Sequence, residues 1–68
     1  MNNIKVFREK IDLSMHELAR RAKVTPSYIN GLEKGHRQNP SKDVMQRIAD
    51  ALGKSVPEVF FPIESEVV

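Results

Sequence analysis

The chain has 68 residues and a net charge of +2. A chain of this length forms one small domain, with no room for a second, and buries only about 60% of its unfolded surface. It also has little room for an enclosed substrate cavity. It contains no cysteine and two histidines, so we expect no disulfide, no metal and no cofactor. No apolar run approaches the about 18 residues of a membrane span, and the charged first residues do not suit a signal peptide, so we expect a cytoplasmic protein.

The charge is unevenly divided along the chain. Residues 1–42 carry nine Lys and Arg against four acids, a net charge of +5, whereas residues 43–68 carry two against five, a net charge of −3. A basic first part suits contact with a polyanion, and the acidic last part suggests a different task. Charge variation without any function remains the alternative.

Apolar residues at helical spacing open the chain and predict its first two helices. Ile4, Phe7 and Ile11 form one stripe of a helix expected over residues 3–11. Ser14 and Glu17 have the spacing of a capping box, in which each side chain bonds to the other residue's backbone N–H. This box starts a second helix over residues 15–22, whose expected inner face is Leu18, Ala19 and Ala22.

The next helix has clear signals at both ends. Thr25 is a good N-cap, and Pro26 suits the first helical position because its missing N–H would have no partner there. Gly35 is suited to ending the helix in a left-handed conformation. We therefore expect a third helix over residues 26–34, with Ile29 and Leu32 inward.

Two further helices are expected in the second half of the chain. Ser41 caps a helix over residues 42–52 that Gly53 ends, and its expected inner face is Val44, Ile48, Ala51 and Leu52. Ser55 and Glu58 form another capping box, starting a short helix that ends near Phe61. The sequence thus predicts an all-α fold of five helices in a domain over residues 1–61. Residues 62–68 are expected to form a short tail, flexible or at a dimer contact.

The connection between the second and third helices is only about three residues long. Such a short link favours two helices that cross steeply, as in a helix-turn-helix unit. The outward residues of the third helix would then be Ser27, Tyr28, Asn30, Gly31 and Lys34. This face has no carboxylate, whereas a typical solvated face mixes Glu and Lys, so it suits insertion into a DNA major groove.

These residues resemble the XRE-type helix-turn-helix regulators, which include the lambdoid phage repressor and Cro proteins. The resemblance runs from Ile4 to Phe61 and rests on FREKIDLSMHELARRAKVTPSYINGLEKG followed by NPSKDVMQRIADALGKSVPEVF. It implies a five-helix, lambda-repressor-like domain of prokaryotic or phage origin. It also implies a homodimer that binds an operator with two-fold related half-sites in double-stranded DNA.

The resemblance also implies roles for individual residues. Base contacts would come from Thr25, Ser27, Tyr28 and Asn30. Phosphate contacts would come from the start of the second helix and from the loop after the third, at Ser14, Met15, Lys34, His36, Arg37, Gln38 and Asn39. Arg8 and Glu33 occupy the positions of an ion pair that braces the first helix against the third.

Four residues depart from the family's pattern. Met15 stands where Gln is common, so one side-chain phosphate contact is missing. Lys23 stands where the turn usually has glycine, so this turn is either strained or built differently. Pro26 cannot donate a hydrogen bond and Gly31 has no side chain, so direct reading of bases would rest on few residues and specificity would lean on DNA shape.

The end of the chain suggests a dimer contact. Phe60 and Phe61 are adjacent and cannot both face one small core, so one of them is expected outside. An outside phenylalanine together with Val56, Val59 and Ile63 would form an exposed apolar strip. We expect the strip at a dimer contact, formed by Val56, Val59, Phe61 and Ile63. A tail folded over it within one subunit is the alternative.

We therefore expect a sequence-specific regulator, most often a repressor in this family, that acts by occupying an operator. No arrangement of residues suggests catalysis, so we do not expect an enzyme, and no small-molecule effector is expected. The alternative hypothesis is a protein-interaction module, such as an anti-repressor or an antitoxin-like partner. The acidic and apolar C-terminal part of the chain favours this alternative. RNA binding would need more stacking aromatics than Tyr28 alone.

Overall fold

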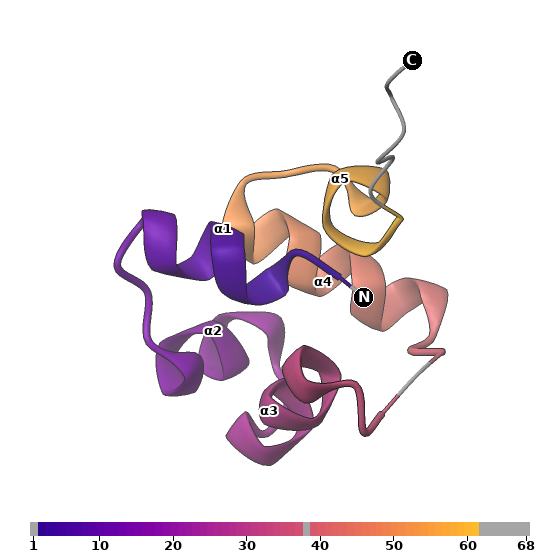
Figure 1. Ribbon diagram of the computed structural model, residues 1–68, viewed down its shortest axis with the longest axis horizontal. Helices are drawn as coiled ribbons and strands as arrows, with labels where there is room; N and C mark the ends of the chain where they lie inside the picture. The colour runs from indigo at the N-terminus through magenta and orange to yellow at the C-terminus, as the bar shows by residue number, and fades with distance from the viewer. Residues whose placement is uncertain (1, 38, 62–68) are drawn as a thin grey trace.

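The computed structural model describes residues 2–37 and 39–61, and this part of the chain contains five α-helices (Figure 1). They are α1 (Ile4–Lys10), α2 (Met15–Ala22), α3 (Pro26–Lys34), α4 (Lys42–Leu52) and α5 (Val56–Phe60). The predicted all-α fold class is confirmed, and the bounds of α2, α3 and α4 agree with the prediction. The tail expected at residues 62–68 lies outside the described residues.

Short polar side chains define where α2 to α5 begin. Each N-cap hydroxyl accepts a hydrogen bond from the backbone N–H three residues later, which satisfies one of the N–H groups that a helix start leaves free. The four N-caps are Ser14, Thr25, Ser41 and Ser55. At the other ends, Gly35 and Gly53 adopt left-handed conformations with φ of 81° and 72°. Both conformations would strain a residue with a side chain.

The first helix is shorter than predicted. α1 ends at Lys10, and Ile11 is 50% exposed, so the expected stripe of Ile4, Phe7 and Ile11 is wrong at its last member. Asp12 follows in a left-handed conformation with φ of 54°, which turns the chain. Leu13 then enters the core in place of Ile11.

The core is centred on α2, which packs against both α3 and α4, and α1 and α5 close it. Its buried apolar side chains are Ile4, Leu13, Leu18, Ala19, Ala22, Ile29, Leu32, Ile48, Ala49, Leu52 and Val59. The predicted inner face of α4 holds for Val44 and Ala51, which are half-buried and pack against the core, but it omits Ala49, which is fully buried. Small side chains at a contact let helix axes approach, and Ala49 supplies this on α4. Arg47 joins α4 to α2 through a hydrogen bond of 2.8 Å from its Nε to the Ala22 carbonyl.

Two asparagines connect the start of the chain to distant helices. The Asn2 side chain donates to the Leu32 carbonyl near the end of α3 over 2.9 Å. The Asn3 backbone N–H donates to the Val59 carbonyl in α5 over 2.8 Å. Because both bonds start beside α1, that helix is tied to α3 and to α5.

The three aromatic and aliphatic residues at the end of α5 have different environments. Val59 is fully buried, Phe60 is half-buried against the core, and Phe61 is 59% exposed. The expectation that one phenylalanine packs inside is confirmed for Phe60. The expected exposed strip is wrong at Val59, because this side chain belongs to the core, and Ile63 lies outside the described residues.

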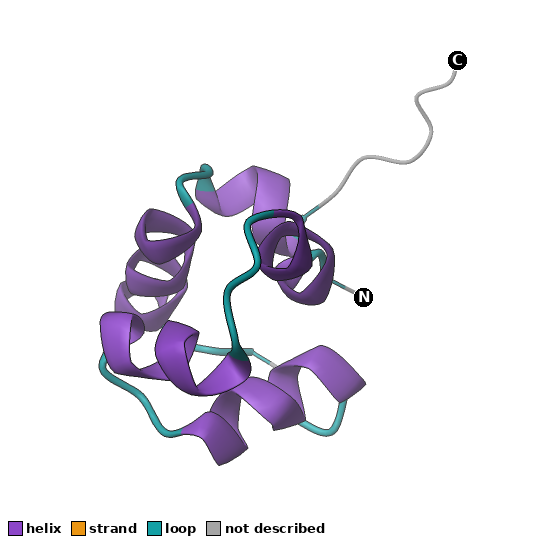
Figure 2. Ribbon diagram, turned by 90° about the vertical axis from the view of Figure 1, so that its left-hand side faces the viewer, coloured by secondary structure: helices purple, strands orange, loops and turns teal. Residues whose placement is uncertain are grey.

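The helices α2 and α3 lie together at one end of the molecule, at the bottom of Figures 1 and 2, with α5 toward the other end. The outer side of α3 is therefore directed away from α5. Among the described residues, we find no helix with the length and apolar character needed to cross a membrane.

Candidate nucleic-acid interface

The turn between α2 and α3 is tight and strained. Lys23 has φ of 60° and ψ of 42°, a left-handed conformation that costs an L-residue about 1–2 kcal/mol. The next residue, Val24, donates its N–H to the Ala19 carbonyl over 3.0 Å, which closes the end of α2. Of the two alternatives left open by the sequence, the turn is thus the strained one, and it sets the direction in which α3 leaves α2.

The start of α2 contains only half of the predicted capping box. Ser14 Oγ accepts a hydrogen bond of 3.0 Å from the Glu17 backbone N–H. The Glu17 carboxylate, however, accepts hydrogen bonds from Arg20 Nε at 3.1 Å and from Arg21 Nε at 3.0 Å instead of reaching back. Hydrogen bonds from Arg20, and then from Arg21, lower the pKa of Glu17 to about 2. The Met15 side chain is half-buried against the core.

The outer face of α3 carries the predicted base-contacting residues. Thr25 and Ser27 are exposed, whereas Tyr28 and Asn30 are half-buried. All nine residues of α3 are described, and the one carboxylate among them is Glu33, whose side chain is only 4% exposed. The face directed to solvent is therefore free of acids, as a surface facing phosphates requires.

Glu33 is buried because it is paired with Arg8. Arg8 Nε lies 2.8 Å from Glu33 Oε2 and Arg8 Nη2 lies 3.1 Å from Glu33 Oε1, a two-point ion pair. Arg8 Nη1 also donates to the Leu13 carbonyl at 3.0 Å. The hydrogen bond with Glu33 raises the pKa of Arg8, so the guanidinium remains protonated. The structure thus contains the ion pair that the resemblance implies, and it connects α1 to α3.

The loop after α3 folds back onto that helix. The backbone N–H groups of His36 and Arg37 both donate to the Gly31 carbonyl, at 2.9 and 3.1 Å. Lys34, His36, Arg37 and Asn39 are exposed, and Gln38 lies outside the described residues. The described phosphate-contact candidates of this loop therefore lie beside the end of α3, apart from those at the start of α2.

One contact brings together two residues to which the sequence assigns separate roles. The Arg37 guanidinium carbon lies 4.9 Å from the centre of the Tyr28 ring, within cation–π range. Tyr28 is expected to contact bases and Arg37 to contact phosphate, so their stacking was not foreseen. The Arg37 side chain passes Gly31 of α3 on its way to Tyr28, and the missing side chain at Gly31 does not by itself reveal that the loop returns over it.

Comparisons with known proteins agree with this geometry. The model of the family described as Helix-turn-helix (HTH_3) matches residues 4–59. An uncharacterized HTH-type transcriptional regulator of Methanothermobacter thermautotrophicus is 40% identical over 63 residues, which cover 93% of this chain and 90% of that protein.

The chain belongs to the helix-turn-helix family of DNA-binding transcriptional regulators.

Two solved structures are also similar to the chain described here. One is the clp gene regulator ClgR from Corynebacterium glutamicum, with a TM-score of 0.74 and 33% identity over 81% of this chain and 57% of that one. The other is a chain of the SinR protein/SinI protein complex, with a TM-score of 0.82 and 28% identity over 96% of this chain and 63% of that one. The predicted lambda-repressor-like fold is confirmed, and the chain spans about 60% of these solved chains.

Family membership assigns parts to the helices. In a helix-turn-helix protein the second helix of the unit is the recognition helix, which here is α3. The family consists of transcriptional regulators, in agreement with the expectation that the chain is not an enzyme.

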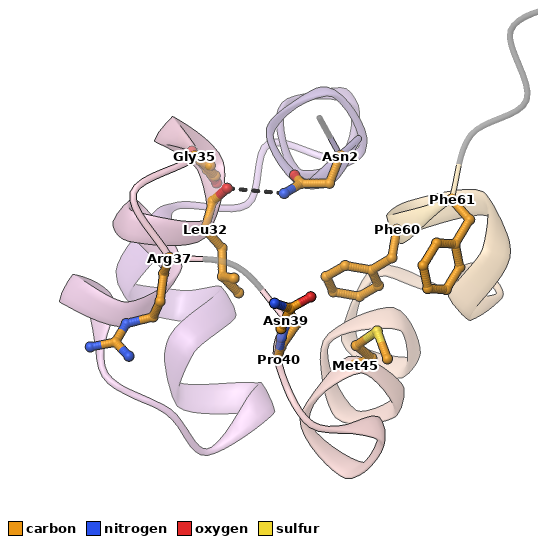
Figure 3. A pocket seen from close by; sticks show the side chains of 10 residues that line it. Asn2, Leu32, Gly35, Arg37, Asn39, Pro40, Met45, Phe60 and Phe61 are labelled. Carbon is orange, nitrogen blue, oxygen red and sulfur yellow. Dashed lines mark hydrogen bonds between the residues drawn. The ribbon is translucent and has the colours of Figure 1, made fainter.

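A pocket of about 400 Å³ lies behind the recognition helix, between the end of α3, the start of α4 and the end of α5. Its apolar side chains include Leu32, Met45, Phe60 and Phe61 (Figure 3). Arg37 also lines this pocket, but its side chain extends away from Phe60 and Phe61 (Figure 3). The Arg37 guanidinium is therefore directed to the outer side of α3.

Proposed function

We propose that this helix-turn-helix regulator is a sequence-specific repressor that binds a two-fold symmetric operator in double-stranded DNA as a homodimer. The observation that supports the proposal is the outer face of α3, which exposes Ser27 and Lys34 and no carboxylate. The opposite side of the same helix is held by the Arg8–Glu33 ion pair. A rigid helix with a neutral to basic outer face suits insertion into the major groove.

Base contacts are assigned to the first turns of the recognition helix. The candidates are Thr25, Ser27, Tyr28 and Asn30. Asn30 is the amide side chain among them, and an amide can bond adenine through both its donor and its acceptor. Pro26 supplies no donor, so the number of direct base contacts is small.

Phosphate contacts are assigned to two places that flank α3. At the start of α2 they would come from Ser14 and from the Met15 backbone amide, where the helix dipole attracts an anion. In and beside the loop after α3 they would come from Lys34, His36, Arg37 and Asn39, while Gln38 lies outside the described residues. Two clusters on either side of the recognition helix would hold the DNA backbone across one groove.

The dimer contact is assigned to the end of the domain. Val56 is half-buried and Phe61 is exposed, so these residues remain candidates from the expected strip. Val59 is excluded because it is buried. In such a dimer the two α3 helices would enter successive major grooves about 34 Å apart, which requires half-sites about 10 bp apart.

Selection from a random library of duplex DNA tests the proposal. The protein is expected to enrich one motif with two-fold symmetry and half-site centres about 10 bp apart. If each subunit neutralises about five phosphates, the logarithm of the binding constant should fall with the logarithm of salt concentration with a slope near −9. Sedimentation of the complex should give two chains per duplex. A protein that retains no duplex at 50 mM salt would instead be a protein-interaction module.

A further inference from the structure

The path of the Arg37 side chain gives this loop residue a place on the recognition helix. Its backbone follows α3, but the side chain runs back over Gly31 toward Tyr28, one turn closer to the start of the helix. A residue that contacts phosphate from a loop would extend toward solvent beside the loop. Arg37 is instead directed to the part of α3 to which base contacts are assigned.

Gly31 leaves room for this path, because it has no side chain. A Cβ at position 31 would lie 3.4 Å from Arg37 Cβ and 4.0 Å from Arg37 Cδ and Nε. Any larger side chain would occupy the space through which Arg37 reaches Tyr28. Arg37 therefore fills the place on the outer face of α3 where position 31 itself has no side chain. Gly31 also has φ in the ordinary helical range, so its value here is the space it leaves and not its backbone freedom.

Stacking on Tyr28 leaves the Arg37 donors available. A guanidinium is planar, and a ring that packs on its face leaves the five N–H donors at its edge. The ring also restricts the rotation of a long side chain, so less entropy is lost when the donors bind a partner. In the major groove the partner that matches two parallel N–H donors is guanine, through O6 and N7.

The geometry points to Arg37 as a specificity-determining residue that reads a guanine, with Tyr28 as its positioning residue. This inference rests on the proposed DNA-binding function and refines it. It moves Arg37 from the phosphate contacts to the base contacts, and it moves Tyr28 from the base contacts to a positioning role. It also gives a recognition helix with few polar side chains a strong donor. The guanine would lie opposite the middle of α3, next to the base read by Asn30.

The test compares Arg37→Lys with the wild-type protein on the duplex enriched by selection and on duplexes with one base pair changed. Lysine keeps the charge but has no planar pair of donors. The variant is expected to lose about 5- to 150-fold discrimination at one G·C pair, which is the range for a bidentate contact. Its affinity for unrelated DNA should stay within about twofold. Lys34→Ala is the matched control, because it should weaken binding to all duplexes alike.

Tyr28→Leu tests the positioning role with Arg37 unchanged. It is expected to reduce discrimination at the same G·C pair, and the double variant with Arg37→Lys should lose little more than either single variant. In the free protein, the Nε–H proton of Arg37 should shift in the NMR spectrum when the Tyr28 ring is removed. Circular dichroism confirms that each variant is folded.

The outcomes separate the two proposals. If wild-type protein binds no duplex at low salt, both the DNA-binding proposal and the role of Arg37 are overturned. If wild-type protein selects a motif but Arg37→Lys discriminates equally well at every position, only the role of Arg37 is overturned. The same holds if Arg37→Ala weakens all duplexes alike and lowers the salt slope by about 1, because that behaviour identifies a phosphate contact.

Discussion

The inner face of α3 carries buried and paired side chains, whereas its outer face carries exposed ones. Inward, Ile29 and Leu32 are buried, and Glu33 accepts two hydrogen bonds from Arg8. Outward, Ser27 is exposed, and none of the hydrogen bonds described above uses its hydroxyl. The two tasks of α3 therefore lie on opposite faces of the same helix. Its inner face contributes to the free energy of unfolding, and its outer face is available for a ligand.

This difference explains how a domain of 68 residues can hold a rigid recognition helix. A chain this short has a stability of only about 3–5 kcal/mol, so it has few interactions to spare for fixing a helix at its surface. The Arg8–Glu33 ion pair connects α3 to α1 on the inner side of the recognition helix. The outer face can then vary in sequence at little cost in stability.

The largest expected effect comes from breaking the inner face. Glu33→Ala leaves the Arg8 guanidinium buried without its partner, and removing one member of a buried pair costs about 3–5 kcal/mol. Because this equals most of the expected stability, the variant should be largely unfolded at 25 °C. Urea unfolding followed by circular dichroism measures the loss.

The matched control is the exposed ion pair on α4. Asp43 is bonded to Arg47, but its side chain is 76% exposed. Asp43→Ala should therefore cost less than about 1 kcal/mol. Equal losses in the free energy of unfolding for Glu33→Ala and Asp43→Ala would show that the buried Arg8–Glu33 pair stabilises the fold no more than an exposed ion pair does.

The next effect concerns the outer face. Asn30→Ala should weaken binding to the selected duplex by about 1–3 kcal/mol and relax the preference at one base pair. The free energy of unfolding should change by less than about 1 kcal/mol, because none of the hydrogen bonds described above uses the Asn30 amide. Fluorescence anisotropy on matched and mutated duplexes gives the first quantity, and urea unfolding gives the second. A loss of stability without a change in base preference would place Asn30 with the inner face.

The ends of most helices could be predicted because they are fixed by local chemistry. Ser14, Thr25 and Ser41 cap their helices through their own backbone neighbours, and Gly35 ends α3 in a conformation that suits glycine. The first helix has no such signals, since Asn3 makes no side-chain cap hydrogen bond. Its end, and the exposure of the residue that follows it, depend on the turn at Asp12 and were predicted wrongly.

The parts of the candidate site that escaped prediction depend on contacts distant in sequence. The stack of Arg37 on Tyr28 requires the loop to return over Gly31, and a residue pattern does not contain this path. Likewise, α5 has only five residues, too few for periodicity to show which side faces the core. Helix α5 packs against α4 and α1, and Val59 is the residue that this packing buries.

A smaller and opposite effect is expected at the turn that sets the orientation of α3. Lys23→Gly removes the strain of a left-handed L-residue, while glycine gives the unfolded chain more entropy. The net effect should be a gain of about 0.5–1 kcal/mol, or an increase of several degrees in Tm. Differential scanning calorimetry measures it. A loss of stability would mean that the Lys23 side chain contributes more than its backbone conformation costs.

The smallest effect is expected from acid on the exposed face of α2. The pKa of Glu17 is about 2 in the folded chain against an ordinary value of 4.5, so its contribution to stability is complete above pH 4.5 and is lost between pH 4.5 and 2. Glu17→Gln should therefore flatten the decline of stability below pH 4.5 and leave the values from pH 5 to 7 nearly parallel to wild type. Because this carboxylate is exposed to solvent, the change should be much smaller than that from Glu33→Ala. If Glu17→Gln leaves the decline of stability below pH 4.5 unchanged, Arg20 and Arg21 do not bind the Glu17 carboxylate in solution.

The hydrogen bonds of Asn3 set an order of events during synthesis. Its side chain donates to the Glu58 carbonyl, 55 residues further along the chain, and its backbone to the following residue. Ribosomes add residues at about 5–20 per second, so the partner carbonyls do not exist until several seconds after Asn3 has been made. These hydrogen bonds therefore form only after α5 has been synthesised, and a nascent chain halted after α4 would lack this closure.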